Sequence, residues 1–175
     1  MRVTNITCTF SIKCPVSFTQ LKYNKNFSDC EFKRNFVVWR LRKPSATALL
    51  FEKGSFTMSG TSSMEDAKRA ARRFCRKLQK LGYTKARLCD FKVRNIALCL
   101  KLGKRLDLTK LSTATERFVI YDQENSNAAL VYGEGSKRFR IFPTGTIILT
   151  GYCDEQEAKK ETSTLYEIAS KIEWT

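Results

Sequence analysis

The sequence repeats itself at a displacement of about 90 residues, and this repetition restricts the fold more than any other feature. Residues 5–10 (NITCTF) are echoed by residues 95–100 (NIALCL). Residues 49–60 return as residues 140–151, each with the pattern Phe-x-x-Gly followed by Ser/Thr-Gly at its end. Because both echoes occur in the same order at nearly one displacement, we interpret the chain as a tandem duplication.

We expect the two units to span residues 1–90 and 91–175 and to share one plan. In each copy a glycine, Gly54 or Gly145, predicts a tight turn between two strands, because glycine tolerates backbone angles that other residues avoid. Apolar and polar residues alternate in the neighbouring strands, as in residues 37–42. Such alternation gives each strand a buried face and an open face.

A helix is predicted after the hairpin in each unit. The first begins with the capping-box sequence of residues 62–65, and apolar residues then recur at helical spacing up to Gly82. The second begins after Asp154 with a similar apolar stripe, and shorter helices are expected after Pro15 and Leu106. Antiparallel strands with long helices predict an α+β fold in which helices cover one face of the sheet.

The open strand faces combine polar residues with isolated large apolar residues. Phe occurs at matching places in both copies, and a merely solvated face would rarely repeat it, although a loop could accommodate one such ring. We therefore interpret the open face as functional. The residues assigned to it are Arg40, Arg42, Leu49, Phe51, Thr57, Ser59, Phe142, Ile148 and Thr150.

Charge indicates the class of partner, and the absence of His restricts the chemistry. The chain has 32 Lys+Arg, 17 Asp+Glu and no His, which gives a net charge of +15. This excess favours a polyanionic partner such as nucleic acid. Without His there is no imidazole base and no His-ligated metal, and Gly103-Lys104 alone is no phosphate loop. We therefore expect neither an enzyme nor a cofactor nor a metal site.

The 7 cysteines are odd in number and lack C-x2-C spacing. They are therefore predicted to be reduced thiols, which indicates the cytosol or the nucleus. Because several lie among apolar neighbours, such as Cys75 and Cys99, we expect small buried hydrophobic residues rather than reactive thiols. The start of the sequence has no apolar segment typical of a signal peptide, and no apolar run approaches the roughly 18 residues that cross a bilayer. No membrane partner is expected.

Several strings, in order, resemble the TATA-box-binding protein family from about Arg2 to Ile172. They are Arg40-x-Arg42-x-Pro44, residues 47–54, Ser59-Gly60, Ala70-Ala71-Arg72-Arg73, residues 79–83 and residues 90–96. The resemblance implies a saddle of two pseudo-symmetric halves, with a curved antiparallel sheet and helices on its convex face. It also implies that the concave sheet binds the minor groove of double-stranded DNA while the helices bind other transcription proteins. We accordingly expect a nuclear transcription initiation factor without a small-molecule substrate.

The resemblance also assigns roles to residues. Asn5 and Asn95 match positions that donate hydrogen bonds to the minor-groove acceptors of A·T pairs. Phe51 and Phe142 match rings that enter base steps, and Arg40 matches a phosphate contact. The remaining expected DNA contacts are Arg42, Thr47, Leu49, Thr57, Ser59, Arg140, Ile148 and Thr150.

The chain also departs from the family pattern, which has two wedge Phe residues in each unit. The second ring aligns with Arg34 in the first unit, unless a slip in register brings in Phe36, and with Asn127 in the second. Arg140 stands at an apolar groove position, and Gly133 stands where a phosphate-binding Arg is expected. Relatives that no longer prefer TATA show changes of this kind, so we expect a TBP-like factor rather than the general TATA-binding protein.

The positive charge is concentrated in the first unit. Residues 1–90 have 19 Lys/Arg and 6 Asp/Glu, whereas residues 91–175 have 13 and 11. Arg72, Arg73 and Arg76 lie opposite the apolar stripe of the first long helix. They are expected either to bind an acidic protein partner or flanking DNA, or to serve solubility alone.

An acidic segment of the second unit resembles a family contact. Asp122 and Glu124 lie in a loop similar to the one that meets transcription factor IIB, although Gln123 replaces its Pro. General transcription factors such as IIA and IIB are therefore the expected partners. The alternative is a TBP-like protein-interaction module that has lost TATA-specific bending and works through its basic helix.

Overall fold

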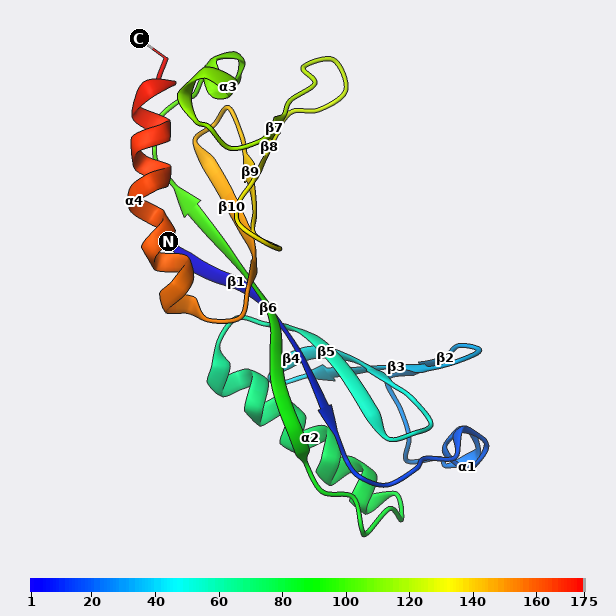
Figure 1. Ribbon diagram of the computed structural model, residues 1–175. Helices are drawn as coiled ribbons and strands as arrows, with labels where there is room; N and C mark the ends of the chain where they lie inside the picture. The colour runs from blue at the N-terminus through cyan, green and yellow to red at the C-terminus, as the bar shows by residue number, and fades with distance from the viewer. Residues whose placement is uncertain (175) are drawn as a thin grey trace. The chain divides into compact units, whose positions relative to one another are not determined.

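The computed structural model describes residues 1–174, which form an α+β fold of ten strands, four α-helices and one 3-10 helix (Figure 1). The chain divides into two compact units. We call Asn5–Arg94 the N-terminal unit, and Met1–Thr4 with Asn95–Thr175 the C-terminal unit. The elements are β1 Arg2–Ser11, α1 Phe18–Tyr23, β2 Cys30–Phe32, β3 Val37–Arg42, β4 Ser45–Leu50, β5 Ser55–Thr61, α2 Met64–Lys80, β6 Cys89–Lys101, η1 Leu108–Lys110, α3 Leu111–Ala114, β7 Val119–Ile120, β8 Ala129–Tyr132, β9 Arg138–Ile141, β10 Thr146–Tyr152 and α4 Glu155–Lys171.

Each unit contains its own run of neighbouring strands. The hydrogen-bonded order is β2-β3-β4-β5-β1 in the N-terminal unit and β6-β10-β9-β8-β7 in the C-terminal unit. The pairs between β2, β3, β4, β5 and β1, and those between β6, β10, β9, β8 and β7, are antiparallel. One long helix packs in each unit, α2 against β4 and β5 and α4 against β10 (Figure 1). The predicted α+β class, with helices on one sheet face, is confirmed.

The core of the N-terminal unit is aromatic. The rings of Phe10 and Phe56 stack with centroids 4.5 Å apart, and the ring of Trp39 meets that of Phe74 of α2 at 5.1 Å. All four side chains are buried, as the alternation of the strands predicts. The helix begins where expected, because the side chain of Ser63 accepts a hydrogen bond from a backbone N–H in its first turn.

The core of the C-terminal unit is more aliphatic. Ile147 and Leu149 of β10 are buried with Leu165 of α4. Arg117 lies 5.0 Å from the ring of Phe139 and forms an ion pair with a carboxylate of α4. The helix is capped by Asp154, as predicted, and the expected short helices are α1 in the first unit and η1 with α3 in the second.

The two predicted turn glycines are required by close approach of the backbone. Gly54 has φ +79° and Gly145 has φ +76°. A Cβ atom would lie 2.1 Å from the carbonyl oxygen of Cys14 at the first and 2.1 Å from that of Lys104 at the second. Both hairpins therefore form as predicted. The repeat boundary expected at residue 90 stays a prediction.

Candidate nucleic-acid interface

An asparagine holds the same hydrogen bond in each unit. Oδ1 of Asn5 accepts from the backbone N–H of Gly60 at 2.7 Å, and Oδ1 of Asn95 accepts from the backbone N–H of Gly151 at 2.7 Å. The strand register shifts beside each glycine, which leaves these N–H groups for the side chain. Because the oxygen is engaged, the amide orientation is set and the NH₂ group remains as a donor.

The open face of the N-terminal unit contains the residues expected there. Thr47 of β4 pairs with Arg40 on one side and Ser59 on the other. Leu49 likewise lies between Val38 of β3 and Thr57 of β5.

Most of these side chains are half-buried, and Arg40 is exposed. The structure thus assembles two neighbouring cross-strand rows, one with hydroxyl groups and a guanidinium, the other with aliphatic groups and a hydroxyl. The roles of these residues in DNA binding stay predictions.

Both arginines of β3 already have carboxylate neighbours. Arg40 lies 3.8 Å from a carboxylate oxygen of Glu31, and Arg42 lies 3.6 Å from one of Asp29. Lys33 also pairs with Glu31, and this lysine is the main cause that lowers the pKa of the Glu31 carboxyl. A phosphate that bound Arg40 would therefore compete with a weak, exposed ion pair.

The residue whose side chain lies beside the Phe51 ring is Phe36 and not Arg34. The two ring centroids are 6.1 Å apart, whereas Arg34 is exposed. Val37 pairs with Leu50, so the residues one step further along the register are Phe36 and Phe51. The N-terminal unit therefore has two neighbouring Phe rings, and the register slip that the sequence left open is the arrangement observed.

The open face of the C-terminal unit has a different character. Arg140 of β9 lies between Leu130 of β8 and Ile148 of β10, in the place that Leu49 occupies in the N-terminal unit. Arg140 is exposed, and within residues 1–174 it has no ion-pair partner. A hollow of about 360 Å³ adjoins it, lined by Leu130, Arg138, Arg140, Ile148 and Thr150.

Phe142 has no neighbouring ring in the part of the chain that the structure describes. Ala129 pairs with Ile141, and continuing this register by one residue places Ala128 opposite Phe142. Asn127, the position expected to face it, is displaced by one residue. Phe142, Ala128 and Asn127 all line a hollow of about 350 Å³ together with Arg140. Phe142 is therefore an isolated ring beside this hollow.

Sequence reasoning missed an aromatic and arginine cluster on this face. Arg138 of β9 occupies the place that Thr47 has in the N-terminal unit, and Tyr132 pairs with it. Tyr132, rather than Gly133, therefore corresponds to Arg40. The Arg138 guanidinium lies 4.3 Å from the Tyr132 ring and donates to two backbone carbonyls, at 2.9 Å and 2.7 Å. The Phe118 ring, which is exposed, lies 5.4 Å from that of Tyr132. The alternation of inward-facing and outward-facing residues within β8 and β9 was the sequence signal that could have predicted this cluster.

The expected partner-binding residues are exposed. Arg72, Arg73 and Arg76 lie on the solvent side of α2, away from its buried stripe. Glu124 is exposed, and Asp122 accepts hydrogen bonds from Asn125 and from the backbone of Glu124, which lower the pKa of its carboxyl. Whether they bind a partner stays a prediction.

Within residues 1–174 no group of three or more His, Cys, Asp or Glu residues could hold a metal ion. None of the described helices is long and apolar enough to span a membrane. The cysteines are free thiols, and Cys8 and Cys75 are buried. Cys8 and Cys75 are thus buried as the sequence predicts, whereas Cys153 is exposed and the other four cysteines are half-buried.

Known proteins resemble the chain over nearly its whole length. The TATA-box-binding protein of Candida albicans is 29% identical over 171 residues, covering 96% of this chain and 71% of its own length. TATA box-binding protein-like 2 of Homo sapiens is 30% identical, covering 96% of this chain and 47% of its own length. The chain thus spans about half the length of several curated relatives.

A solved structure agrees with the fold. The TBP of Methanococcus jannaschii superimposes with a TM-score of 0.83 over 98% of both chains, at 18% identity. The sequence profile described as transcription factor TFIID, or TATA-binding protein, matches residues 1–81 and 90–172. With most of both repeats matched and the fold shared, the chain belongs to the TATA-binding protein family.

Proposed function

We propose that the chain is a DNA-binding transcription initiation factor that binds the minor groove of A·T-rich DNA through the open face of each unit. The observation that supports this most is the asparagine pair. In each unit a backbone N–H holds the amide oxygen of Asn5 or Asn95, so that an NH₂ donor remains. Minor-groove edges of A·T pairs present only acceptors, which suit such donors.

The wedge contribution is expected to be unequal. Phe36 and Phe51 offer two neighbouring rings in the N-terminal unit, whereas Phe142 is alone in the C-terminal unit. Unstacking a base step costs about a few kcal/mol, which inserted rings must offset through added contact. We propose that the N-terminal unit supplies most of the bending, and that Arg140 of the C-terminal unit contributes electrostatic attraction instead.

Inosine substitution tests the choice of groove. An I·C pair presents the same minor-groove acceptors as A·T but a different major-groove edge, whereas G·C adds an amino donor to the minor groove. We expect the full chain to bind an I·C version of an A·T-rich duplex about as tightly as the original. The G·C version should bind more weakly at equal salt. Weak binding to I·C with tight binding to A·T would place recognition in the major groove.

Partner recruitment is proposed for the helices and the acidic loop. Arg72, Arg73 and Arg76 on α2 form an exposed basic set that suits an acidic transcription protein, and Asp122 with Glu124 suits a basic one. General transcription factors such as IIA and IIB are the proposed partners, and the nucleus is the proposed location.

A second function has one observation in its favour. The lone Phe142 and the charged Arg140 make the open face of the C-terminal unit poorly suited to wedge insertion. If neither open face binds duplex DNA, the chain is a protein-interaction module that works through α2. This second function would be identified if the chain bound none of the A·T-rich, I·C and G·C duplexes but still bound its protein partner.

A further inference from the structure

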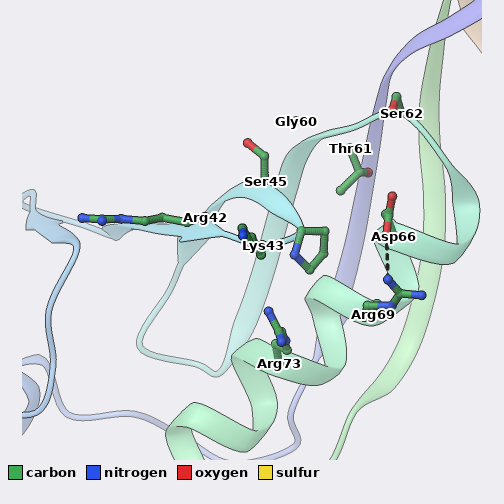
Figure 2. Close-up of a pocket in the computed structure, with 10 residues that line it drawn as sticks. Arg42, Lys43, Ser45, Gly60, Thr61, Ser62, Asp66, Arg69 and Arg73 are labelled. Carbon is green, nitrogen blue, oxygen red and sulfur yellow. Dashed lines mark ion pairs between the residues drawn. The ribbon is translucent and has the colours of Figure 1, made fainter.

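We propose that a basic pocket of the N-terminal unit binds a phosphate monoester, as carried by a phosphorylated serine or threonine of a protein partner. The pocket measures about 410 Å³. It is formed where the turn between β3 and β4, the end of β5 and the part of α2 from Asp66 to Arg73 meet (Figure 2). Four cationic side chains and one carboxylate line it: Arg42, Lys43, Arg69, Arg73 and Asp66.

Two of these cations have no carboxylate partner. Arg69 pairs with Glu65 and lies 3.4 Å from a carboxylate oxygen of Asp66, which therefore adds little free negative charge. Within residues 1–174, Lys43 and Arg73 form no ion pair. Figure 2 shows Arg73 extending from α2 towards the turn that carries Lys43. Two unpaired positive charges from separate elements thus adjoin one hollow.

A buried hydroxyl is a second and independent observation. Thr61, at the end of β5, lines the same pocket and is only 3% exposed. Its Oγ1 has no hydrogen-bond partner among the described residues. Buried polar groups are nearly always paired, because an unpaired one loses its hydration without compensation. A ligand oxygen that Thr61 reached by rotation of its side chain would supply the missing partner.

A phosphate monoester matches this set better than a carboxylate does. It is a dianion near neutral pH with three terminal acceptor oxygens, whereas a carboxylate has one charge and two oxygens. Arg73, Lys43 and Thr61 line the pocket from different segments, so a guanidinium, an ammonium and, after rotation, a hydroxyl can each be offered to a different oxygen of a tetrahedral group.

The inference gives the proposed partner of α2 a specific chemistry, and in that respect it rests on the recruitment role. It does not depend on DNA binding by the open faces, since Lys43 and Thr61 are not among the residues proposed to contact DNA and Arg73 lies on α2 rather than on an open strand face. Measurements without DNA therefore separate failure of this inference from failure of the DNA-binding proposal.

The decisive experiment titrates the full chain with O-phosphoserine and with a short serine-phosphorylated peptide, using calorimetry and ³¹P NMR at constant ionic strength. The double variant Lys43→Ala, Arg73→Ala should bind either probe about tenfold more weakly or worse. The matched control Lys80→Ala, Lys85→Ala loses the same charge outside the pocket and should bind as the parent does. Equal losses in both variants, no binding by the parent, or competition by unmodified DNA duplex as effective as phosphopeptide would overturn the proposal.

The variant Thr61→Val tests the contribution of the Thr61 hydroxyl separately from the electrostatic attraction by the cations of the pocket. Valine has nearly the same shape, and the hydroxyl that it removes has no partner in the fold, so the thermal midpoint without ligand should not fall. Phosphoserine affinity should fall severalfold. Unchanged phosphoserine affinity in a folded Thr61→Val variant would show that the ligand does not reach this pocket as proposed.

Discussion

Asn95 accepts a 2.7 Å hydrogen bond from the backbone N–H of Gly151, and this contact orients the side-chain amide of Asn95. The same contact joins Asn5 to Gly60. An asparagine held in this way loses little conformational entropy when its NH₂ group binds an acceptor, because the rotamer is already selected. The repeated contact connects the duplication in the sequence to the proposed recognition of A·T pairs.

Replacing the asparagine by aspartate tests this role. Asn95→Asp keeps the oxygen that accepts from Gly151 but replaces the donor with a negatively charged acceptor. We expect affinity for an A·T-rich duplex to fall about tenfold or more, since a neutral hydrogen bond of about 0.5–1.5 kcal/mol is lost and the new carboxylate is repelled by the negatively charged DNA. Fluorescence anisotropy measures it. Asn26→Asp, an exposed position with the same charge change, is the control, and an equal loss there would contradict the assignment.

Ring truncations test the unequal wedges. Phe51→Ala and Phe36→Ala should each reduce bending of a labelled A·T-rich duplex, measured as an increase in end-to-end distance by energy transfer. Phe142→Ala should have a smaller effect, because its ring has no partner. Ala128→Phe should increase bending, since the register places this position opposite Phe142. Equal effects of Phe51→Ala and Phe142→Ala would show that the two units act alike.

Arg140→Leu tests whether charge has replaced a groove contact. Leucine reproduces the aliphatic group that Leu49 presents in the N-terminal unit. An arginine is attracted to the strong negative potential of a narrow minor groove, as in A-tracts, more than to a flexible alternating TA sequence. We expect the parent to prefer an A-tract duplex and the variant to lose part of this preference. The measurement is competition between the two duplexes, and an unchanged ratio would exclude this role of Arg140.

Arg40→Ala should weaken binding to all duplex sequences about equally, because a phosphate contact carries no base information. The slope of log affinity against log salt should become shallower by about one unit per lost contact. Because Glu31 forms a weak ion pair with Arg40, the variant Glu31→Gln should strengthen binding to DNA slightly. Binding titrations over a salt series give both results. A loss confined to one sequence would contradict a phosphate contact.

Burial raises the pKa of the Cys8 thiol from 9.0 to about 11. Since the folded state holds this proton more tightly than the unfolded chain does, its contribution to stability is complete below pH 9. It is lost as the pH rises towards 11. Denaturant unfolding at several pH values should show a decline over this range that is shallower in Cys8→Ala. Equal slopes in both proteins would contradict the raised pKa.

Local patterns determined the elements and their faces from sequence alone. The alternation of Val37, Trp39 and Leu41 with Val38, Arg40 and Arg42 predicted the buried face of β3, and Ser63 and Asp154 marked where the long helices begin. These features depend on neighbours within a few residues, because strand and helix periods are local properties. The duplication and the strings resembling the TATA-binding protein family then indicated the fold.

Only the tertiary structure decided which residues meet across strands. The turn between β3 and β4 has two residues and that between β8 and β9 has five, so a fixed displacement between the repeats misplaces their partners. In the folded sheet Phe36 meets Phe51, Ala128 rather than Asn127 lies opposite Phe142, and Tyr132 pairs with Arg138. Strand register depends on hydrogen bonds and packing between segments distant in sequence, and a shift of one residue sends a side chain to the opposite face. The sequence therefore determined the elements and the family, whereas the composition of each open face was decided by the register of the folded sheet.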